Sequence, residues 1–149
     1  MSTPLARTQV SSTTPLDEST RLLAAVVCDN VAQPLSAVVA HKDVGCIERF
    51  FAAGFPVHVA IHRVDSAERQ QRDYTELHSH KEAEINILIP AATGMTYAIR
   101  LGDELKELSG CASVYVPPYL AHSANVIEGS GYFITLRLQL DPGAASSTR

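Results

Sequence analysis

From Tyr74 onward, hydrophobic and polar residues alternate in short runs, each bounded by residues that favour turns. A period of two predicts strands, and many short strands at this spacing are typical of an all-β sandwich or barrel. The pattern predicts strands over Tyr74 to His80, Ala83 to Pro90, Met95 to Leu101, Glu104 to Leu108, Cys111 to Val116, Ala121 to Glu128 and Gly131 to Leu140.

Turn signals separate these runs and leave no room for the helices of parallel β/α units. No internal repeat is evident. The expected turns are Ala92-Thr93-Gly94, Gly102-Asp103, Ser109-Gly110, Pro117-Pro118 and Gly129-Ser130-Gly131.

The first third of the chain has a different pattern. Thr14-Pro15 is typical of a helix start, and apolar residues follow at helical spacing as far as Val31. Pro34 ends that helix. A short strand is expected over Ser36 to Ala40 and a helix over Val44 to Ala53. We therefore expect a flexible tail over 1–13, an N-terminal helical extension with a lead-in strand over 14–54, a barrel over 55–140 and a flexible tail over 141–149.

Val57 to Val64 alternates as a strand. One of its faces carries His58, Ala60 and His62. The two histidines either line a polar cavity or lie on a solvated face. The solvated face is the favoured interpretation, and both residues are kept as candidates for substrate binding.

Composition narrows the possible partners. The 149 residues suffice for one domain with a hydrophobic core, and the net charge is −4 without a basic cluster, which argues against nucleic acid as a partner. No apolar run approaches the ~20 residues that span a bilayer, and no secretory signal is evident, so no membrane partner is expected. Cys28, Cys46 and Cys111 are widely spaced, which favours reduced thiols in a cytoplasmic protein.

The densest group of metal-binding residue types is the stretch from His78 to Glu84. His78 and His80 are two residues apart, so on a strand they point to the same face. Glu84 opens the next run, and a short turn can bring it back towards them. Two imidazoles and a carboxylate resemble the open sites of non-haem iron and mononuclear zinc enzymes. The alternative is a solvated strand with surface charges.

A third histidine, His122, follows Pro117-Pro118 at the start of another predicted strand. With it, the sequence resembles the cupin superfamily over about residues 55 to 140. The first cupin motif contains HxHxxxE, which His78, His80 and Glu84 match. Gly110, Pro117 and His122 match part of the second motif. Tyr119 stands where that motif usually has Gly, Asn125 and Gly110 are each displaced by one residue, and Ala91 replaces the Gly that closes the first motif.

The resemblance is to a small single-domain cupin of the RmlC-like jelly-roll type. It implies an all-β double-stranded β-helix whose metal ligands are His78, His80, Glu84 and His122, with two open positions on a six-coordinate ion. Fe(II), Mn(II), Ni(II), Co(II) and Zn(II) all suit imidazole and carboxylate ligands, and Fe(II) is favoured. A degenerate cupin with the fold and no bound metal is the alternative.

Further site candidates follow from strand parity. Asn86 and Glu76 lie two residues from a proposed ligand and share its direction. Tyr97, Arg100 and Arg137 are candidates for binding a substrate carboxylate, because an Arg fork suits that group. The candidates for acid–base catalysis are Tyr115, Tyr119, Glu76 and His58.

The expected function is a metal-dependent enzyme that acts on a small polar metabolite, with an Fe(II)-dependent dioxygenase favoured. A redox-neutral isomerase, lyase or dehydratase is the first alternative, and a non-catalytic small-molecule-binding cupin is the second. The last predicted strand carries an apolar face that either packs as core or forms a homodimer interface. Its residues are Tyr132, Ile134, Leu136, Leu138 and Leu140.

Overall fold

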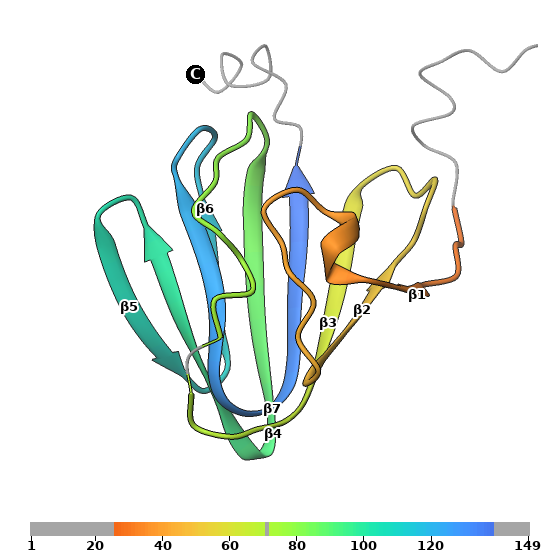
Figure 1. Cartoon of the computed structure of the whole chain (residues 1–149). Helices are drawn as coiled ribbons and strands as arrows, with labels where there is room; N and C mark the ends of the chain where they lie inside the picture. Colours follow the sequence, from red (N-terminus) through yellow and green to blue (C-terminus); the bar gives the residue numbers. More distant parts are fainter. Residues whose placement is uncertain (1–25, 71, 139–149) are drawn as a thin grey trace, which may run out of the picture.

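The computed structural model describes residues 26–70 and 72–138, which form one strongly curved antiparallel sheet (Figure 1). The strands are β1 (Val31–Gln33), β2 (Ile47–Phe51), β3 (His58–Ala67), β4 (Ala83–Leu101), β5 (Glu104–Ser109), β6 (Ala112–Val116) and β7 (His122–Leu138), and a 3-10 helix, η1 (Leu35–Ala37), follows β1. The order across the sheet is β1-β2-β3-β7-β4-β5, with β6 paired to β4. The predicted all-β class is confirmed.

Two long strands organise the sheet. β4 pairs with β7 along almost its whole length, from Ala83 opposite Leu138 to Leu101 opposite His122. The first half of β4 also pairs with β6, and its second half pairs with β5. β7 pairs with β4 on one side and with β3 on the other, so β4 and β7 connect both halves of the fold.

The turns predicted at residues 92–94 and 129–131 are wrong. Both stretches lie inside β4 and β7, where the register shifts and the strands bend. Gly129 (φ 92°) and Gly131 (φ 148°) allow this bend. A Cβ atom on Gly129 would lie 2.1 Å from the carbonyl oxygen of Gly94, so no other residue fits without a backbone shift.

Two predictions for the N-terminal part of the chain are wrong. The helix predicted over Val44 to Ala53 is wrong, because these residues contain β2, which pairs with β1 and β3. The strand predicted over Ser36 to Ala40 is also wrong, since η1 occupies part of it. The helix expected from Thr14 lies largely outside the described residues, as do most of both predicted tails. Where it would enter them, residues 26–30 have no regular structure.

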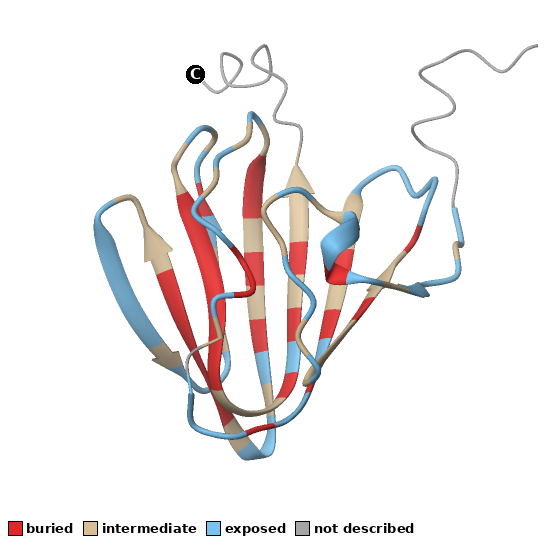
Figure 2. Ribbon diagram, in the orientation of Figure 1, coloured by how far each residue is buried: buried red, intermediate tan, exposed pale blue. Residues whose placement is uncertain are grey.

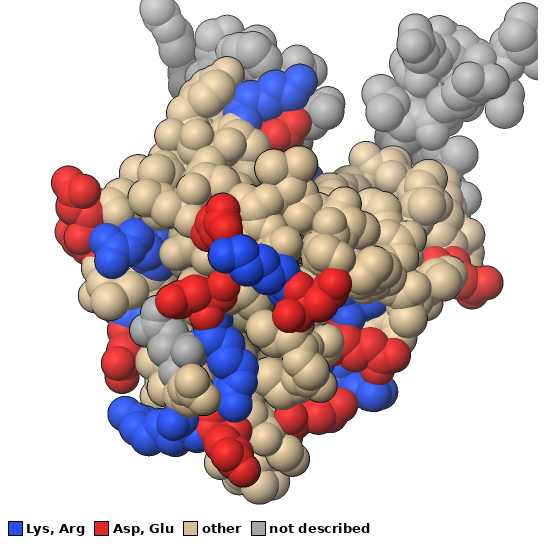
Figure 3. Space-filling model, viewed as in Figure 1, with Lys and Arg blue, Asp and Glu red and all other residues tan. Residues whose placement is uncertain are grey.

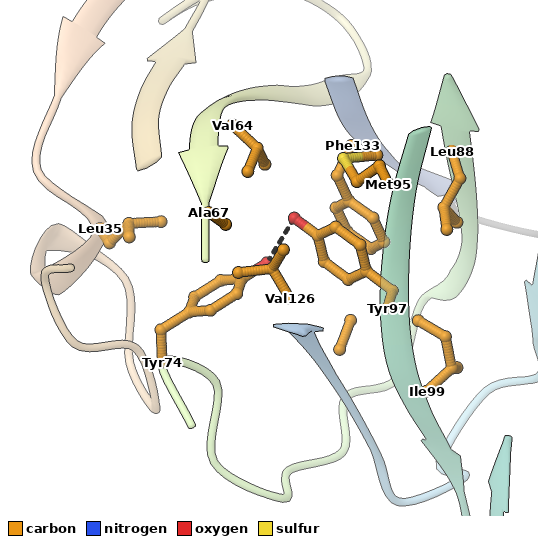
Figure 4. Close-up of a cluster of buried hydrophobic side chains, with 11 residues drawn as sticks. Leu35, Val64, Ala67, Tyr74, Leu88, Met95, Tyr97, Ile99, Val126 and Phe133 are labelled. Carbon is orange, nitrogen blue, oxygen red and sulfur yellow. Dashed lines mark hydrogen bonds between the residues drawn. The ribbon is translucent and has the colours of Figure 1, made fainter. Parts of the chain in front are cut away.

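The buried side chains of the hydrophobic core come from several strands and from η1 and lie close together (Figure 4). Tyr97 stacks on Phe133 with ring centroids 4.6 Å apart, and the Tyr74 hydroxyl donates a hydrogen bond to the Tyr97 hydroxyl over 3.3 Å. The burial pattern alternates in the first part of β4 and the last part of β7, residues 95–99 and 122–127 are buried throughout, and β5 is mostly exposed (Figure 2). Alternation of this kind places one face of the long strands inside the fold.

Two irregular segments cover the concave face of the sheet. The segment around His41 pairs with the segment around Thr75 through an isolated bridge, and backbone hydrogen bonds join Lys42 to Tyr74 and Glu76 to Ala40. Within the described residues, no helix is long and apolar enough to cross a membrane.

Candidate metal centre

Three histidines that are distant in sequence meet at one point. His78 and His80 lie in the segment between β3 and β4, and His122 is the first residue of β7. One potential ligand atom from each lies within 4.8 Å of the other two. The ring centroids of His78 and His122 are 4.5 Å apart, and those of His80 and His122 are 4.9 Å apart.

The backbone fixes this meeting point. His78 and His122 form a two-way bridge, with N–H to O=C hydrogen bonds of 3.1 and 2.8 Å. The Tyr119 amide donates to the carbonyl of His80 over 2.8 Å. The strand predicted over Tyr74 to His80 is wrong, since only isolated bridges occur there. The bridge to β7 holds His78 in place instead.

Hydrogen bonds to the backbone orient all three imidazole rings. The Nδ1 atoms of His78, His80 and His122 lie 2.8, 2.9 and 2.8 Å from the carbonyl oxygens of Glu76, Glu82 and Leu120, respectively. A carbonyl can only accept, so each Nδ1 carries the proton and each Nε2 keeps its lone pair. Metal-binding histidines are typically oriented in this way.

Glu84 lies beside two of these Nε2 atoms. Its Oε2 atom is 3.0 Å from Nε2 of His80, and its Oε1 atom is 3.6 Å from Nε2 of His122. The Nε of Arg137 donates to Oε2 over 3.1 Å, across the β4–β7 ladder. The carboxylate is therefore held between a guanidinium and the histidines.

The donor and acceptor atoms of this group suit a bound cation. Both nitrogens of His80 face acceptors, the carbonyl oxygen of Glu82 and the carboxylate of Glu84. A neutral imidazole has only one N–H, so it cannot donate to both. The Nε2 of His122 is buried and makes no hydrogen bond among the described residues. A divalent ion bound by the Nε2 atoms and Glu84 would satisfy these atoms, so the donor set fits a metal.

The shifts in pKa agree with a charged carboxylate. Burial alone raises the pKa of Glu84, but its interactions with His122 and Arg137 outweigh burial and lower that pKa to about 2. Burial lowers the pKa of His122, but Glu84 and the Leu120 carbonyl outweigh this and raise it. Glu84 is therefore available as an ionised ligand at neutral pH.

Next to the histidines lies an inner cavity of about 30 Å³, with room for about two water molecules. An outer pocket of about 440 Å³ shares part of its wall, and is large enough for a small metabolite. Residues common to both walls are Val38, Arg49, His58, His78 and Arg137.

His58 and His62 both line the inner cavity. The favoured interpretation of a solvated face for these residues is wrong, because His62 is only 4% exposed and stacks on Phe133. Burial, the largest cause in both cases, lowers the pKa of His58 to about 4 and that of His62 to about 3. Both rings are therefore neutral at pH 7.

The sequence interpretation missed two cavity residues, His41 and Arg49. The Nδ1 of His41 lies 3.0 Å from the carbonyl of Val39, and its ring centroid is 5.8 Å from that of His78. Arg49 lies at the centre of β2, opposite His62 of β3. No local motif marks either residue. The only signal for Arg49 is that the pair Glu48-Arg49 interrupts an otherwise apolar run.

Of the four proposed acid–base residues, His58 lines the inner cavity and the other three do not. Tyr115 and Tyr119 are 54% and 74% exposed, and neither lines the inner cavity or the outer pocket. The side chain of Glu76 forms an ion pair of 2.7 Å with Lys42, and lies with Arg100 in a separate groove of about 370 Å³. The backbone carbonyl of Glu76, rather than its carboxylate, contacts His78.

The remaining candidates divide between core and cavity. Asn86 is 1% exposed and accepts a hydrogen bond of 3.1 Å from the hydroxyl of Thr135, which lines the inner cavity. Tyr97 belongs to the core and is absent from the cavity wall. Arg137 lines both the cavity and the pocket.

Solved structures of other proteins are similar to this fold. No protein-family model matches the sequence, and no curated protein does so either. A cupin superfamily protein from Desulfitobacterium hafniense matches the structure with a TM-score of 0.51 at 14% identity, over 76% of this chain and 98% of that one. A predicted oxalate decarboxylase from Thermotoga maritima gives 0.51 at 12% identity, over 76% and 94%. The iron(II) form of HppE gives 0.52 at 13% identity, over 76% and 60%.

The fold and the site together define a small β-barrel with a candidate three-histidine metal centre. The chain has the cupin fold, which confirms the resemblance seen in the sequence at the level of the fold.

Proposed function

We propose that the protein is a metal-dependent enzyme that acts on a small polar metabolite, with Fe(II) as the favoured ion and dioxygen as the favoured co-substrate. One observation supports this most strongly. His80 places both ring nitrogens against acceptors, and the three histidines converge with Glu84 beside two of them, an arrangement that a divalent cation satisfies. His78, His80, His122 and Glu84 would hold the ion.

The bound ion supplies either Lewis-acid polarisation of a chelating oxygen or, as Fe(II), the activation of dioxygen. The iron(II) form of HppE is a solved structure of the same fold that holds this ion. The residues of this chain position the reaction. Arg137 fixes the carboxylate of Glu84, and the walls of the inner cavity limit the access of water.

A redox-neutral isomerase, lyase or dehydratase is the second candidate. Such an enzyme needs a base near the substrate, and His41, His58 and His62 line the inner cavity. Burial lowers the pKa of each, so all three are neutral at pH 7, but pKa values of about 4 for His58 and about 3 for His62 make these two weak bases.

The first test is metal content. Protein stripped with a chelator, loaded anaerobically with Fe(II) and desalted should hold about one ion per chain, measured by atomic emission. His80→Ala should lose most of it. His41→Ala is the matched control, because His41 has the same bond from Nδ1 to a carbonyl but lies outside the ligand group. Full metal retention by His80→Ala would contradict the assignment.

The second test separates the reactions. The Fe(II)-loaded protein is supplied with a panel of small hydroxy and oxo acids in air-saturated buffer, and oxygen uptake is recorded. Oxygen uptake that depends on both iron and one acid supports the dioxygenase. Conversion of an acid without oxygen, by the Zn(II)- or Mn(II)-loaded protein, supports the redox-neutral enzyme instead. Binding without conversion under either condition identifies a non-catalytic binding protein.

A further inference from the structure

Arg49 is a buried cation in the wall of the site. It is 4% exposed, and no other lysine or arginine among the described residues is classed as buried. It projects from the middle of β2, where the ladder places Gln33 of β1 on one side and His62 of β3 on the other. Three strands therefore hold its backbone in place.

The guanidinium of Arg49 has few partners in the chain. Its Nη1 donates to Oε1 of Gln33 over 3.3 Å, and its Cζ lies 4.9 Å from the ring centroid of Phe51. No carboxylate of the described residues forms an ion pair with it. A guanidinium has five N–H donors, and a buried charge without a counter-ion is costly. Among the described residues, the Arg49 guanidinium therefore has no anionic partner and can accept a bound anion.

The charges around Arg49 also favour the binding of an anion. Two guanidinium groups, Arg49 and Arg137, line the inner cavity, and Glu84 is the one carboxylate among the lining residues. Arg137 is already paired with Glu84. A divalent ion at the histidines would make the site still more positive, which favours an anionic ligand.

Arg49 and the candidate metal ligands share one space. The outer pocket is lined by Arg49 on one side of the sheet and by His78 and His80 from the covering segment. Its volume of about 440 Å³ admits a molecule of several carbon atoms. One small ligand can therefore contact both the guanidinium and the metal.

We propose that Arg49 binds a carboxylate of the substrate, and that the substrate is a small acid with a second oxygen donor group, such as a hydroxy- or oxo-dicarboxylic acid. A carboxylate matches the planar fork of the guanidinium. The second donor group chelates the metal, so this end of the inference rests on the proposed function. Arg49 thus selects the substrate at the end remote from the metal.

The test uses two probes that differ at one end. 2-Hydroxysuccinate and 2-hydroxybutyrate share the chelating hydroxy acid, but only the first has a second carboxylate. Each is titrated by calorimetry into Zn(II)-loaded protein, since Zn(II) does not react with oxygen. Arg49→Met should weaken the binding of 2-hydroxysuccinate by about 10- to 100-fold and leave the affinity for 2-hydroxybutyrate unchanged. Arg49→Lys should restore part of the loss.

The control variant is Arg63→Met. Arg63 lies on β3, is exposed and pairs with Glu48 over 2.6 Å, so its loss should change neither affinity. A purely structural role for Arg49 predicts a lower melting temperature in Arg49→Met. Our proposal predicts an equal or higher one without ligand, because the variant removes an unpaired buried charge. Arg49→Gln is a second variant with the same expected loss of affinity, should Arg49→Met fold poorly.

Several results would overturn the proposal. Equal weakening of both probes, or no weakening of either, shows that Arg49 does not contact the second carboxylate. Inorganic phosphate binding to wild-type protein more tightly than 2-hydroxysuccinate shows the wrong class of anion. Zinc content is measured on the same samples. If no zinc binds, the proposed function fails, and succinate titrated into the metal-free protein still tests Arg49 by the same comparison of variants.

Discussion

His62 is an imidazole enclosed by other rings. It stacks on Phe133, meets His41 and Tyr74 edge-on, and its Nδ1 has no hydrogen-bond partner among the described residues. Charging it inside the fold is unfavourable, and burial lowers its pKa to about 3. An unfolded chain has an ordinary histidine pKa of about 6.5.

This difference makes the stability of the protein depend on pH. Between pH 6.5 and 3 the unfolded chain binds a proton at residue 62 that the folded chain does not. The contribution of His62 is therefore fully retained above pH 6.5 and is lost as the pH falls. We expect His62→Phe to reduce the slope of the unfolding free energy by up to about 1.4 kcal/mol per pH unit in this range.

Urea unfolding of metal-free protein at pH 4.5, 5.5, 6.5 and 8 measures the slope. Between pH 6.5 and 8 the difference in unfolding free energy between wild type and His62→Phe should no longer change with pH. Identical slopes for the two proteins between pH 4.5 and 6.5 would show that His62 accepts a proton in the folded state.

For single residues, the sequence predicted the candidate metal ligands better than the residues that line the inner cavity. The HxHxxxE spacing and His122 are local patterns, and the structure brings the three histidines together with Glu84 beside two of them. Tyr119 departs from the usual Gly of the second motif, yet its φ of 65° is the left-handed conformation that Gly favours. His41 and Arg49 have no such pattern, because their place in the wall depends on pairing between distant segments.

Among the elements, β4 and β7 depend on glycine where they bend together. Gly129 and Gly131 have positive φ angles, and the backbone of β4 approaches both closely. The close approach lets one strand pair along its whole length with another that changes direction. A side chain at either position would push the two strands apart.

Three alanine substitutions separate conformational strain from crowding. Gly129→Ala should destabilise the fold by more than about 2 kcal/mol, because strain and a clash add. Gly94→Ala has open space and a φ of 83°, so strain alone should cost about 1–2 kcal/mol. Gly45→Ala has open space and no positive φ, and should stay within about 1 kcal/mol of wild type. Denaturant midpoints rank the three, and a Gly129→Ala variant as stable as Gly94→Ala would contradict the clash.

The sequence predicted elements where their pattern was local. Alternation along Glu104–Ser109 and Ala112–Val116 identified β5 and β6 closely. Ile47, Phe50 and Phe51 have a spacing that also fits one face of a helix, and pairing with β1 and β3 overrides that preference. The glycines at 94 and 129 signalled turns, but their partners across the ladder show that they form bends within strands.

The whole molecule has an apolar surface on the outside of its sheet. On β4 and β7 the residues that alternate with the inward-facing ones form an outer apolar face, in which Ile89 lies opposite Tyr132, Ile87 opposite Ile134 and Ile85 opposite Leu136. Ile89 and Tyr132 are 42% and 46% exposed. Elsewhere, on the side seen in Figure 3, acidic and basic side chains are interspersed.

We propose that a second copy of the chain covers this outer apolar face, as a homodimer. Wild-type protein should sediment as a dimer at micromolar concentration. The double variant Ile89→Lys/Tyr132→Lys should sediment as a monomer, because charges would have to be buried at the contact. Leu105→Lys, at an exposed position on β5, is the control and should remain dimeric. A monomeric wild type would contradict the interface.

The position of β7 in the chain also determines when the candidate metal ligands come together. β7 is the last described strand, yet it lies between β3 and β4 and supplies both His122 and Arg137. A growing chain that lacks residues 122–138 therefore has two unjoined halves, two of the three histidines and no guanidinium to hold Glu84. Long-range pairing of this kind slows folding. Metal capture would then report the pairing of β7, because this strand joins β3 to β4 and completes the ligand set in a single step.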